Sequence, residues 1–559
     1  MNNVDNFWLC MDEPTNLMVI TAFMEFDEPI DFERLKSTID VRLARFDRFR
    51  KRVVKPVSGV GVPHWEFDRN YDIRSHVHRL ALPSPGDKAE LQEMVSNLTT
   101  APLDLSKPLW QVYLIENYEN GCVVFFKIHH CIADGIALIH VLLSAADTEA
   151  NAPWPESRPV KKEKSFSLDR ILPFGSTIKS VQNLAKSTRK VGKLLAREGL
   201  DTISHPGRLV EMTKAATGLT ADAASLLSRL TIMPSDPDTP FKGRLGVRKT
   251  VAWTEPMPLD KIKTVGRAID TTTLNDVLIA TVTGALRRYL KKRNVRVNDL
   301  DLRVAVPVNI RKPGTEFELG NKFSTVFLAL PVYLEDPVLR LKEVKRRMDN
   351  LKHSMDAVVG YGLMSALGVL PPNMAKKAAH LFGNKASGVM TNVPGPRQPL
   401  YFSGSKIRNL MFWVPRAGKV GLGISILSYD GEVTVGVASD EGLLPDPEVL
   451  LEGFEEEFNY LLELVKSGKI YHGPLVLHDR YQEAQQKKIE KPETRDADSP
   501  RQCKALTKAG KRCRRRAMPG SDFCNTHKSD PRVAQFRKIR TETEDDRQAQ
   551  VAQSIAGIM

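Results

Sequence analysis

The sequence predicts an α/β (α+β) fold, and three features of the 559-residue chain point to it. Helical and strand patterns alternate through residues 1–150 and again from about 246 to 480. The continuous run of bulky and β-branched residues from Cys122 to Ile128 is typical of a buried strand, and a polar loop and an apolar helix follow it at once. The chain is also too long for one compact core, so two or three domains are expected.

The regular elements follow from the spacing of apolar residues and from the turn residues. A one-sided helix has apolar residues three and four positions apart, whereas strands are short β-branched or aromatic runs. Asp430-Gly431 divides one such run and predicts a hairpin turn. The expected helices are 32–46, 136–143 and 446–465, and the expected strands are 122–128, 302–310 and 419–440.

The six cysteines are too few for a disulfide framework in a chain of this length, and they indicate a reducing compartment. The first residues, MNNVDNFWLCMDEP, lack the basic region and apolar core of a signal peptide. No window holds 18 or more apolar residues, so no transmembrane helix is predicted. We therefore expect a cytoplasmic protein that meets membranes or lipid droplets peripherally.

The net charge of +14 is concentrated in two segments. Residues 151–200 hold eleven Lys or Arg against four Asp or Glu, and residues 481–559 hold eighteen against eleven, so each carries +7 and the rest is formally neutral. This predicts either an acidic partner, such as an anionic membrane or lipid-droplet surface, or merely solvated, flexible segments. Amphipathic stretches within 151–245 predict basic helices that either lie in a lipid interface or pack on a protein core.

The segment His129-His130-x-x-x-Asp134-Gly135 follows the buried strand and carries the chemistry. A neutral imidazole is suited to taking the proton of an alcohol that attacks a carbonyl carbon. Adjacent histidines on an extended segment point in opposite directions, so only one is expected to face a substrate. Asp134 is expected to pair with an arginine that holds the loop, and Gly135 to allow a close approach or a positive φ. The alternative is two loop histidines that merely satisfy hydrogen bonds.

Several ordered motifs over residues 1–480 make the chain resemble the bacterial wax ester synthase/diacylglycerol acyltransferase family, which is related to chloramphenicol acetyltransferase and to condensation domains. The HHxxxDG motif matches in full, and TNVPGP departs from the common form only by Thr391 in place of serine. The other matching motifs are Pro108-Leu109-Trp110, Asn275-Asp276, VPVNIR ending at Arg311, and Gly320-Asn321.

The resemblance implies two chloramphenicol acetyltransferase-like subdomains, 1–150 and 246–480, joined by the helical crossover 151–245, with a tunnel between them. It implies direct transfer of a long acyl group from acyl-coenzyme A to diacylglycerol or a long-chain alcohol, giving triacylglycerol or wax ester, without a catalytic cofactor. His130 would be the general base, and His129, Asp134 and Gly135 would shape the loop. A glycolipid or polyketide hydroxyl, a carrier-bound acyl group and a non-catalytic lipid-binding scaffold stay open as alternatives.

The remaining site residues are less strongly indicated. Resemblance to condensation domains favours Arg50 as the partner of Asp134, with Arg311 second. Asn275 and Asp276 precede an apolar helix, so helix capping and a substrate-binding role are both open. Asn392 lies in a segment that reads as a turn, and its substrate-binding role rests on the resemblance alone. A nucleophilic Cys131 is disfavoured because neighbours on an extended loop face apart.

A separate module is predicted beyond a linker at 481–500. Residues 501–530 contain Cys503, Cys513, Cys524 and His527, a set that suits a tetrahedral Cys3His zinc site, although unliganded thiols are the alternative. Neighbouring arginines make the module basic, and only through it would nucleic acid be a partner. A flexible tail, 531–559, is expected to end the chain.

Overall fold

A computed structural model of the chain describes residues 1–56, 62–150, 152–154, 233–269, 272–311, 315, 318–352, 356–368 and 372–469. The predicted crossover helices fall largely within 155–232, and the linker, zinc module and tail fall beyond 469. Those expectations lie outside the described residues, and the domain boundaries stay predictions.

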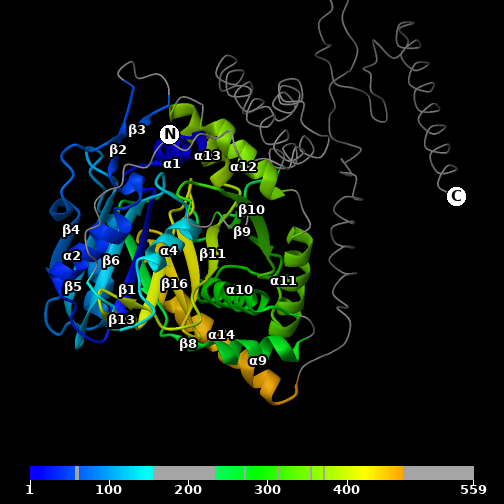
Figure 1. The fold of residues 1–559 in the computed structure, drawn as a ribbon. Coiled ribbons are helices and arrows are strands. Elements are labelled where there is room, and N and C mark those ends of the chain that lie inside the picture. The colour runs from blue at the N-terminus through cyan, green and yellow to red at the C-terminus, as the bar shows by residue number, and fades with distance from the viewer. Residues whose placement is uncertain are drawn as a thin grey trace, which may run out of the picture. The chain divides into compact units, whose positions relative to one another are not determined.

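The first sheet is built mainly from the N-terminal part of the chain and has five strands in the order β14-β1-β6-β5-β4. Strands β1, β4, β5 and β6 of this sheet lie side by side in Figure 1. Its central strand β6 is buried along its whole length, as expected of a run rich in β-branched and aromatic residues. The elements of this part are α1 (Asn3–Met11), β1 (Val19–Phe26), α2 (Phe32–Thr38), β2 (Lys51–Val54), β3 (His64–Phe67), β4 (Val77–Ala81), α3 (Lys88–Thr100), β5 (Trp110–Tyr118), β6 (Gly121–His129) and α4 (Gly135–Ser144).

One edge of this sheet comes from far along the chain. Strand β14 (Asn409–Trp413) pairs antiparallel with β1, so that Thr21 lies opposite Trp413. On its other side β1 pairs antiparallel with β6, with Val19 opposite His129. The C-terminal half of the chain therefore completes the N-terminal sheet and is tied to the strand that ends at the histidine motif.

The second sheet is mixed and has seven strands, in the order β10-β9-β11-β15-β16-β7 with β8 paired to β16. Its central neighbours β9, β11 and β15 run parallel, and the outer pairs run antiparallel. The remaining elements are β7 (Lys249–Trp253), β8 (Met257–Pro258), α9 (Leu259–Ala268), α10 (Leu274–Lys292), β9 (Leu302–Asn309), β10 (Phe323–Leu330), α11 (Pro337–Lys352), α12 (Asp356–Leu367), α13 (Pro372–Gly383), β11 (Gly388–Pro394), β12 (Tyr401–Phe402), β13 (Ser405–Lys406), β15 (Leu422–Tyr429), β16 (Glu432–Asp440) and α14 (Pro447–Lys466).

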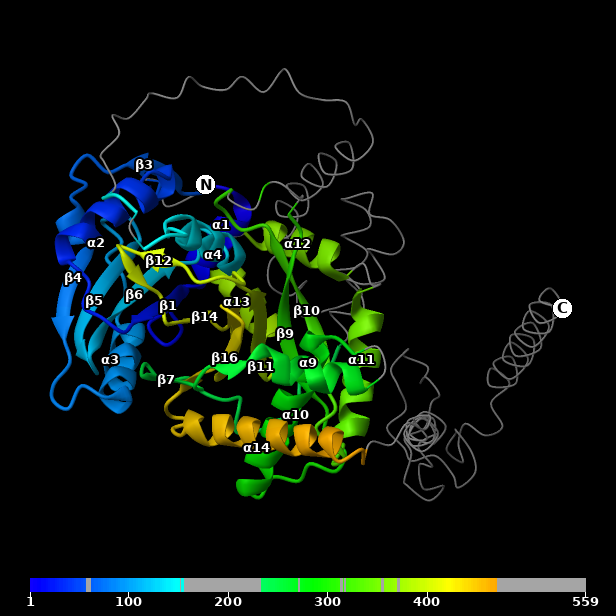
Figure 2. The ribbon, with the colours of Figure 1, turned by 60° about the horizontal axis from the view of Figure 1, so that its bottom comes forward.

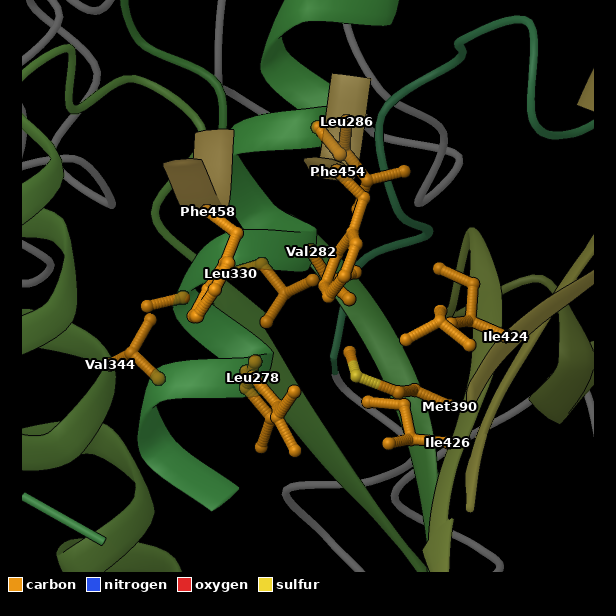
Figure 3. Packing of buried hydrophobic residues seen from close by; sticks show 14 of the residues in the cluster. Leu278, Val282, Leu286, Leu330, Val344, Met390, Ile424, Ile426, Phe454 and Phe458 are labelled. Carbon is orange, nitrogen blue, oxygen red and sulfur yellow. The ribbon is translucent and has the colours of Figure 1, made fainter. Parts of the chain in front are cut away.

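Helices α10, α11 and α14 bury their apolar faces against this second sheet, and α14 runs alongside α10 (Figure 2). Side chains from the three helices interlock with those of β10, β11 and β15 (Figure 3). The residues labelled there are Leu278, Val282, Leu286, Leu330, Val344, Met390, Ile424, Ile426, Phe454 and Phe458. In the described part of the chain, every helix is too short or too polar to cross a membrane.

The first helix of the chain, α1, packs against helices that come much later in the sequence. Asn2 caps α1 by accepting a hydrogen bond from the Asp5 N–H at 2.7 Å. The helix lies against α12 and α13, and Phe7, Trp8 and Met11 join an apolar cluster with residues of those helices. This contact brings the N-terminus to the edge of the second sheet, where it reaches the histidine motif.

The predicted mixed α/β class is confirmed, and most predicted elements are present. The strand predicted at 122–128 lies within β6, and the hairpin turns at Asp430 and Gly431, whose φ angles are 47° and 80°. The helix predicted over 32–46 is shorter, because α2 passes into a π-helical turn at Ile39–Leu43. Local spacing therefore identified the elements, and tertiary packing set their ends.

Candidate active site

The histidine motif lies where β6 ends and α4 begins. The His129 N–H donates to the Leu109 carbonyl at 3.0 Å, and the His130 N–H donates to the Met18 carbonyl at 2.7 Å. Asp134 caps α4 by accepting from the Ala137 N–H at 3.0 Å. The two histidines thus begin a short loop whose backbone is held from both sides.

Asn321 determines which nitrogen of His130 carries the proton. The Asn321 amide nitrogen donates to the His130 carbonyl at 2.8 Å and to Asp5 Oδ1 at 2.9 Å, so its Oδ1 must be the atom that faces the ring. That Oδ1 lies 2.8 Å from His130 Nδ1. Because an amide oxygen only accepts, Nδ1 carries the proton and Nε2 keeps its lone pair. Nε2 has no hydrogen-bond partner among the described residues.

A chain of buried polar groups extends this contact. Asp5 is fully buried, and its Oδ2 lies 2.8 Å from Arg48 Nη1. Arg48 also donates to the carbonyls of Ile132 at 2.7 Å and Cys131 at 3.2 Å. Burial raises the pKa of Asp5, and the charge of Arg48 opposes that shift. The segment between the histidines and Asp134 is therefore fixed through its carbonyls as well as through the imidazole.

Aromatic rings cover the imidazole of His130. Trp8 stacks on it with ring centroids 3.9 Å apart and an interplanar angle of 11°, and Phe323 lies 5.5 Å away. Burial in this apolar surrounding lowers the pKa of His130 to about 4. The imidazole is consequently neutral near pH 7.

Trp8 also lines an apolar cavity of about 130 Å³. The cavity lies between α1, α12, α13 and the strands β9, β10 and β11. Its wall contains Phe7, Trp8, Met11, Ala305, Thr325, Phe327, Gly360, Leu363, Met364, Leu367, Ala379, Gly383, Ala386, Val389, Ala417 and Val420. A cavity of about 150 Å³ accommodates benzene, so this one takes roughly the end of an alkyl chain. The longer tunnel expected from the resemblance stays a prediction.

The prediction that Arg50 pairs with Asp134 was wrong. Arg311, the second candidate, places Nη1 2.6 Å from Asp134 Oδ2, and both side chains are buried. Arg50 instead lies 3.9 Å from Asp40, in a partly exposed pair. The correction has a topological reason: β9 leads Arg311 to the loop from the second sheet, whereas the segment around Arg50 presents Arg48 to the loop carbonyls.

The positive φ predicted as one possibility for Gly135 was wrong, and a close approach by substrate stays a prediction. The φ of Gly135 is not positive, and a Cβ added there would lie 3.9 Å from Val414 Cγ1, which is an ordinary contact distance. It is simply the first residue of α4. Neither strain nor crowding among the described residues explains this glycine.

Neither His129 nor Cys131 belongs to the wall of the cavity that Trp8 lines. His129 Nδ1 accepts from the Cys131 N–H at 3.1 Å, and His129 Nε2 lies 3.7 Å from Asp12 Oδ1. Cys131 is fully buried in the apolar core of the first sheet. This geometry favours a structural role for His129, and Cys131 lies in a different apolar cluster from Trp8, the residue that covers the His130 ring.

The three residues expected at a substrate site lie in two groups. Asn275 and Asn392 touch, since Asn392 Nδ2 donates to Asn275 Oδ1 at 2.8 Å. Asp276 forms a capping box with Thr273, the N-cap of α10, and accepts from its N–H at 2.8 Å. Asp276 therefore has the capping role, although not as the cap residue itself. The predicted turn at Asn392 was wrong, because this residue lies within β11.

The described residues contain no group of three or more His, Cys, Asp or Glu side chains placed to hold a metal ion. The predicted zinc ligands Cys503, Cys513, Cys524 and His527 lie outside those residues. The zinc site therefore stays a prediction.

Sequence reasoning missed Trp8, Asp5 and Arg48, and it noted Asn321 only as part of a motif. No local pattern identifies these residues, because helix α1 reaches His130 only through tertiary packing. The one available signal was Gly320-Asn321 itself, in which a buried asparagine follows a glycine with φ of 116°.

The fold and the geometry define a class of protein: a mixed α/β protein whose buried, neutral histidine stacks on a tryptophan that lines an apolar cavity. Residues 1–278 match the wax ester synthase/diacylglycerol acyltransferase catalytic domain, and residues 319–462 match the C-terminal domain of the same family. The chain belongs to the wax ester synthase/diacylglycerol acyltransferase family and is an acyltransferase.

Known proteins support this assignment in sequence and in fold. A putative diacylglycerol O-acyltransferase of Mycobacterium tuberculosis is 28% identical over 493 residues, covering 83% of this chain and 90% of that protein. A second, probable diacylglycerol O-acyltransferase from the same species is 29% identical over 446 residues, covering 79% and 90%.

Two solved structures have a similar fold. The wax ester synthase/diacylglycerol acyltransferase of Marinobacter aquaeolei superposes with a TM-score of 0.58 at 21% identity, covering 83% of this chain and 99% of that one. The first condensation domain of the calcium-dependent antibiotic synthetase gives 0.50 at 16% identity, covering 83% and 94%.

Proposed function

We propose that this acyltransferase moves a long-chain acyl group from acyl-coenzyme A to diacylglycerol or a long-chain alcohol, with His130 as general base. The hydrogen bond from His130 Nδ1 to Asn321 carries the proposal, because it leaves Nε2 free to take a proton. The sequence relatives named as diacylglycerol O-acyltransferases support the choice of acceptor.

The proposed reaction is direct. As the acceptor oxygen attacks the thioester carbonyl carbon, its proton passes to His130 Nε2. The tetrahedral intermediate then expels the coenzyme A thiolate, which takes the proton back from Nε2. The Nδ1–H of His130 stays hydrogen-bonded to Asn321 Oδ1 throughout, so the ring keeps its orientation. No acyl-enzyme and no cofactor enter this scheme.

The low pKa of His130 is compatible with this role. Burial disfavours the imidazolium, which keeps the resting base neutral. During attack a negative oxyanion forms beside the ring and supplies the counter-charge that the apolar wall lacks. The imidazolium is thus stabilised when the substrate reacts and disfavoured before it binds.

The apolar cavity beside Trp8 suits part of an acyl or alkyl chain. Its wall is almost wholly apolar, and the same indole touches both the cavity and the base. Since the cavity takes only about six carbon atoms by comparison with benzene, the rest of a long chain must lie elsewhere. We propose that a short part of the chain occupies this cavity while the ester carbon lies near His130.

Release of free thiol from palmitoyl-coenzyme A tests the proposal, with hexadecanol or diolein as acceptor. His130→Gln should abolish most of the release, whereas His64→Gln, at an exposed histidine of β3, should leave it unchanged. Retention of the rate by His130→Gln would show that another group is the base. If the wild-type protein releases no thiol with either acceptor, the proposed acceptor class is refuted, and a glycolipid, polyketide or carrier-bound substrate is favoured.

We also propose that the basic segment 151–200 docks on an anionic membrane or lipid-droplet surface, where such acceptors reside. Each Lys or Arg near an anionic surface contributes about 1 kcal/mol, screened over roughly 10 Å at ordinary salt. Sedimentation with anionic and neutral liposomes across a salt series tests this. Loss of binding on deletion of 481–559 would assign docking to the tail instead.

For the tail we propose a structural zinc held by Cys503, Cys513, Cys524 and His527, with nucleic acid as a partner only through this module. The support is the ligand spacing in the sequence. Metal analysis of the purified chain should give one zinc, which Cys524→Ser should remove. An unchanged metal content in that variant would refute the ligand set.

A further inference from the structure

Arg416 is a buried cation whose guanidinium has no hydrogen-bonded partner among the described residues. Arg416 is only 6% exposed, and no described residue forms a hydrogen bond or ion pair with its guanidinium. Its backbone carbonyl, in contrast, accepts from Asn16 Nδ2 at 2.7 Å. Burial lowers the pKa of Arg416 to about 10, so the group is still charged at neutral pH. A buried unpaired charge is strongly unfavourable, which calls for a counter-charge.

Arg416 lines a cavity of about 30 Å³ that is separate from the cavity beside Trp8. The cavity lies between the loop at 14–17, the start of β1, the end of α3, and β7 and β16. The Thr99 hydroxyl and the Trp413 indole N–H, on residues of the same wall, have no hydrogen-bond partner either. Unsatisfied donors therefore gather around this cavity.

The carboxylate of Asp440 attracts Arg416, but it is shared with Lys249 and with two backbone N–H groups. Lys249 lines the wall, and its Nζ lies 2.5 Å from Asp440 Oδ2. Asp440 also accepts from the Gly246 and Gly442 N–H groups, at 2.9 and 3.2 Å.

A third buried cation lies close by. Lys127 pairs across the strands with Thr21, another residue of the wall, and therefore shares its face of the sheet. Its Nζ donates to the Ala101 carbonyl at 2.7 Å and has no carboxylate partner among the described residues. In this part of the structure, the described residues thus place three buried cations around the buried carboxylate of Asp440.

We propose that this cavity binds a small anion, with Arg416 as its charged ligand. The chemical class follows from charge and size. The local excess of positive charge selects an anion, and a cavity of about 30 Å³ favours a small one, such as a halide or a single carboxylate group. The hydroxyl of Thr99 is a second donor for it.

Such an anion would hold the segment that supports His130. Asn16 bonds the Arg416 carbonyl, and Asp12 accepts from the Met18 N–H at 2.7 Å. The Met18 carbonyl in turn accepts the His130 N–H. The loop that lines the anion cavity is therefore the same loop that positions the base.

Thermal unfolding of the full chain in chloride, acetate or phosphate tests the site. Each anion replaces gluconate, which is too large for the cavity, at constant ionic strength. Chloride or acetate should raise the Tm saturably, because a ligand that binds only the folded state stabilises it. Phosphate should add nothing. Line broadening of the chloride NMR signal by the protein provides a readout independent of unfolding.

Two variants and a control separate the site from general salt effects. Arg416→Met should abolish the chloride dependence of the Tm and the line broadening, and Arg416→Lys should keep both in weaker form. Arg74→Met removes an equal charge from a side chain that is 78% exposed and should change neither. An absent or non-saturating anion effect, a rise with phosphate as large as that with chloride, or the same effect in Arg416→Met would overturn the proposal. All readouts are independent of acyl transfer.

Discussion

Replacement of Asn321 by alanine separates the positioning of His130 from its chemistry. The variant removes the acceptor of the His130 Nδ1–H and the donor to the His130 carbonyl, both at 2.8 Å, and it also leaves Asp5 Oδ1 without its amide partner. The imidazole can then rotate or exchange its proton between the two nitrogens. We expect a fall in kcat larger than any change in KM.

The magnitude follows from the bonds that are lost. A hydrogen bond to a charged group contributes about 1.5–3 kcal/mol, and the ring is charged in the transition state. Since about 1.4 kcal/mol corresponds to a factor of ten in rate, kcat should fall about 10- to 100-fold. Unpaired buried groups cost about 1–3 kcal/mol each, so loss of the partners of the His130 Nδ1–H and carbonyl should lower the free energy of unfolding by about 2–6 kcal/mol.

Thiol release and denaturant unfolding measure the two effects in the same preparation. Asn409→Ala is a matched control, because Asn409 is also buried and accepts from the Leu410 N–H and the Thr434 hydroxyl at 2.8 and 2.9 Å. The control should lose a comparable amount of stability with little change in kcat. An equal loss of kcat in both variants would refute the positioning role of Asn321.

A second substitution at the same position gives a pH signature. In Asn321→Asp a carboxylate would accept the Nδ1–H and favour the imidazolium, which raises the pKa of His130 from about 4. Because the base acts in its neutral form, activity is lost as the pH falls through this pKa. The acid limb of the kcat/KM profile should therefore move to higher pH. An unshifted limb would contradict the contact between residue 321 and the catalytic ring.

Three further predictions concern the same loop. Arg311→Met should lower the free energy of unfolding by about 3–5 kcal/mol, because it leaves the buried Asp134 carboxylate without its ion-pair partner. Arg50→Met should lower it by less than about 1 kcal/mol. Equal losses in denaturant unfolding would contradict the observed pairing. Gly135→Ala should leave the Tm unchanged or raise it, because φ is negative at this residue and a Cβ has room. A large drop in Tm would contradict this prediction. A loss of rate without a loss of Tm would indicate that substrate passes close to Gly135. The pKa of His130 in the folded protein, about 4, lies below its ordinary value of 6.5, so the folded protein binds fewer protons than the unfolded chain between these pH values. The free energy of unfolding should therefore fall as the pH decreases from 6.5 to 4. His130→Gln should remove this contribution, and an unchanged pH slope in that variant would refute it.

Much of the fold could be predicted because its signals are local. A continuous apolar run marked the strand β6, and Asp430-Gly431 marked a hairpin whose two central residues have positive φ. These features depend on neighbours within a few residues, where the period of the side chains and the turn chemistry are decisive. The end of α2 could not be predicted in the same way, because its passage into a π-helical turn has no signature in the spacing.

The candidate site also has features that depend on local sequence and features that depend on tertiary packing. The sequence by itself determined that His130 follows a buried strand, that a helix follows the loop containing Asp134, and that the motifs belong to one family. Only the tertiary structure decided that Asn321, 191 positions away, orients the ring, that Trp8 stacks on it, and that Arg311 pairs with Asp134. The physical reason is that these partners meet across two sheets and helix α1, where burial makes unpaired polar groups costly and the relative placement of distant segments selects the partner.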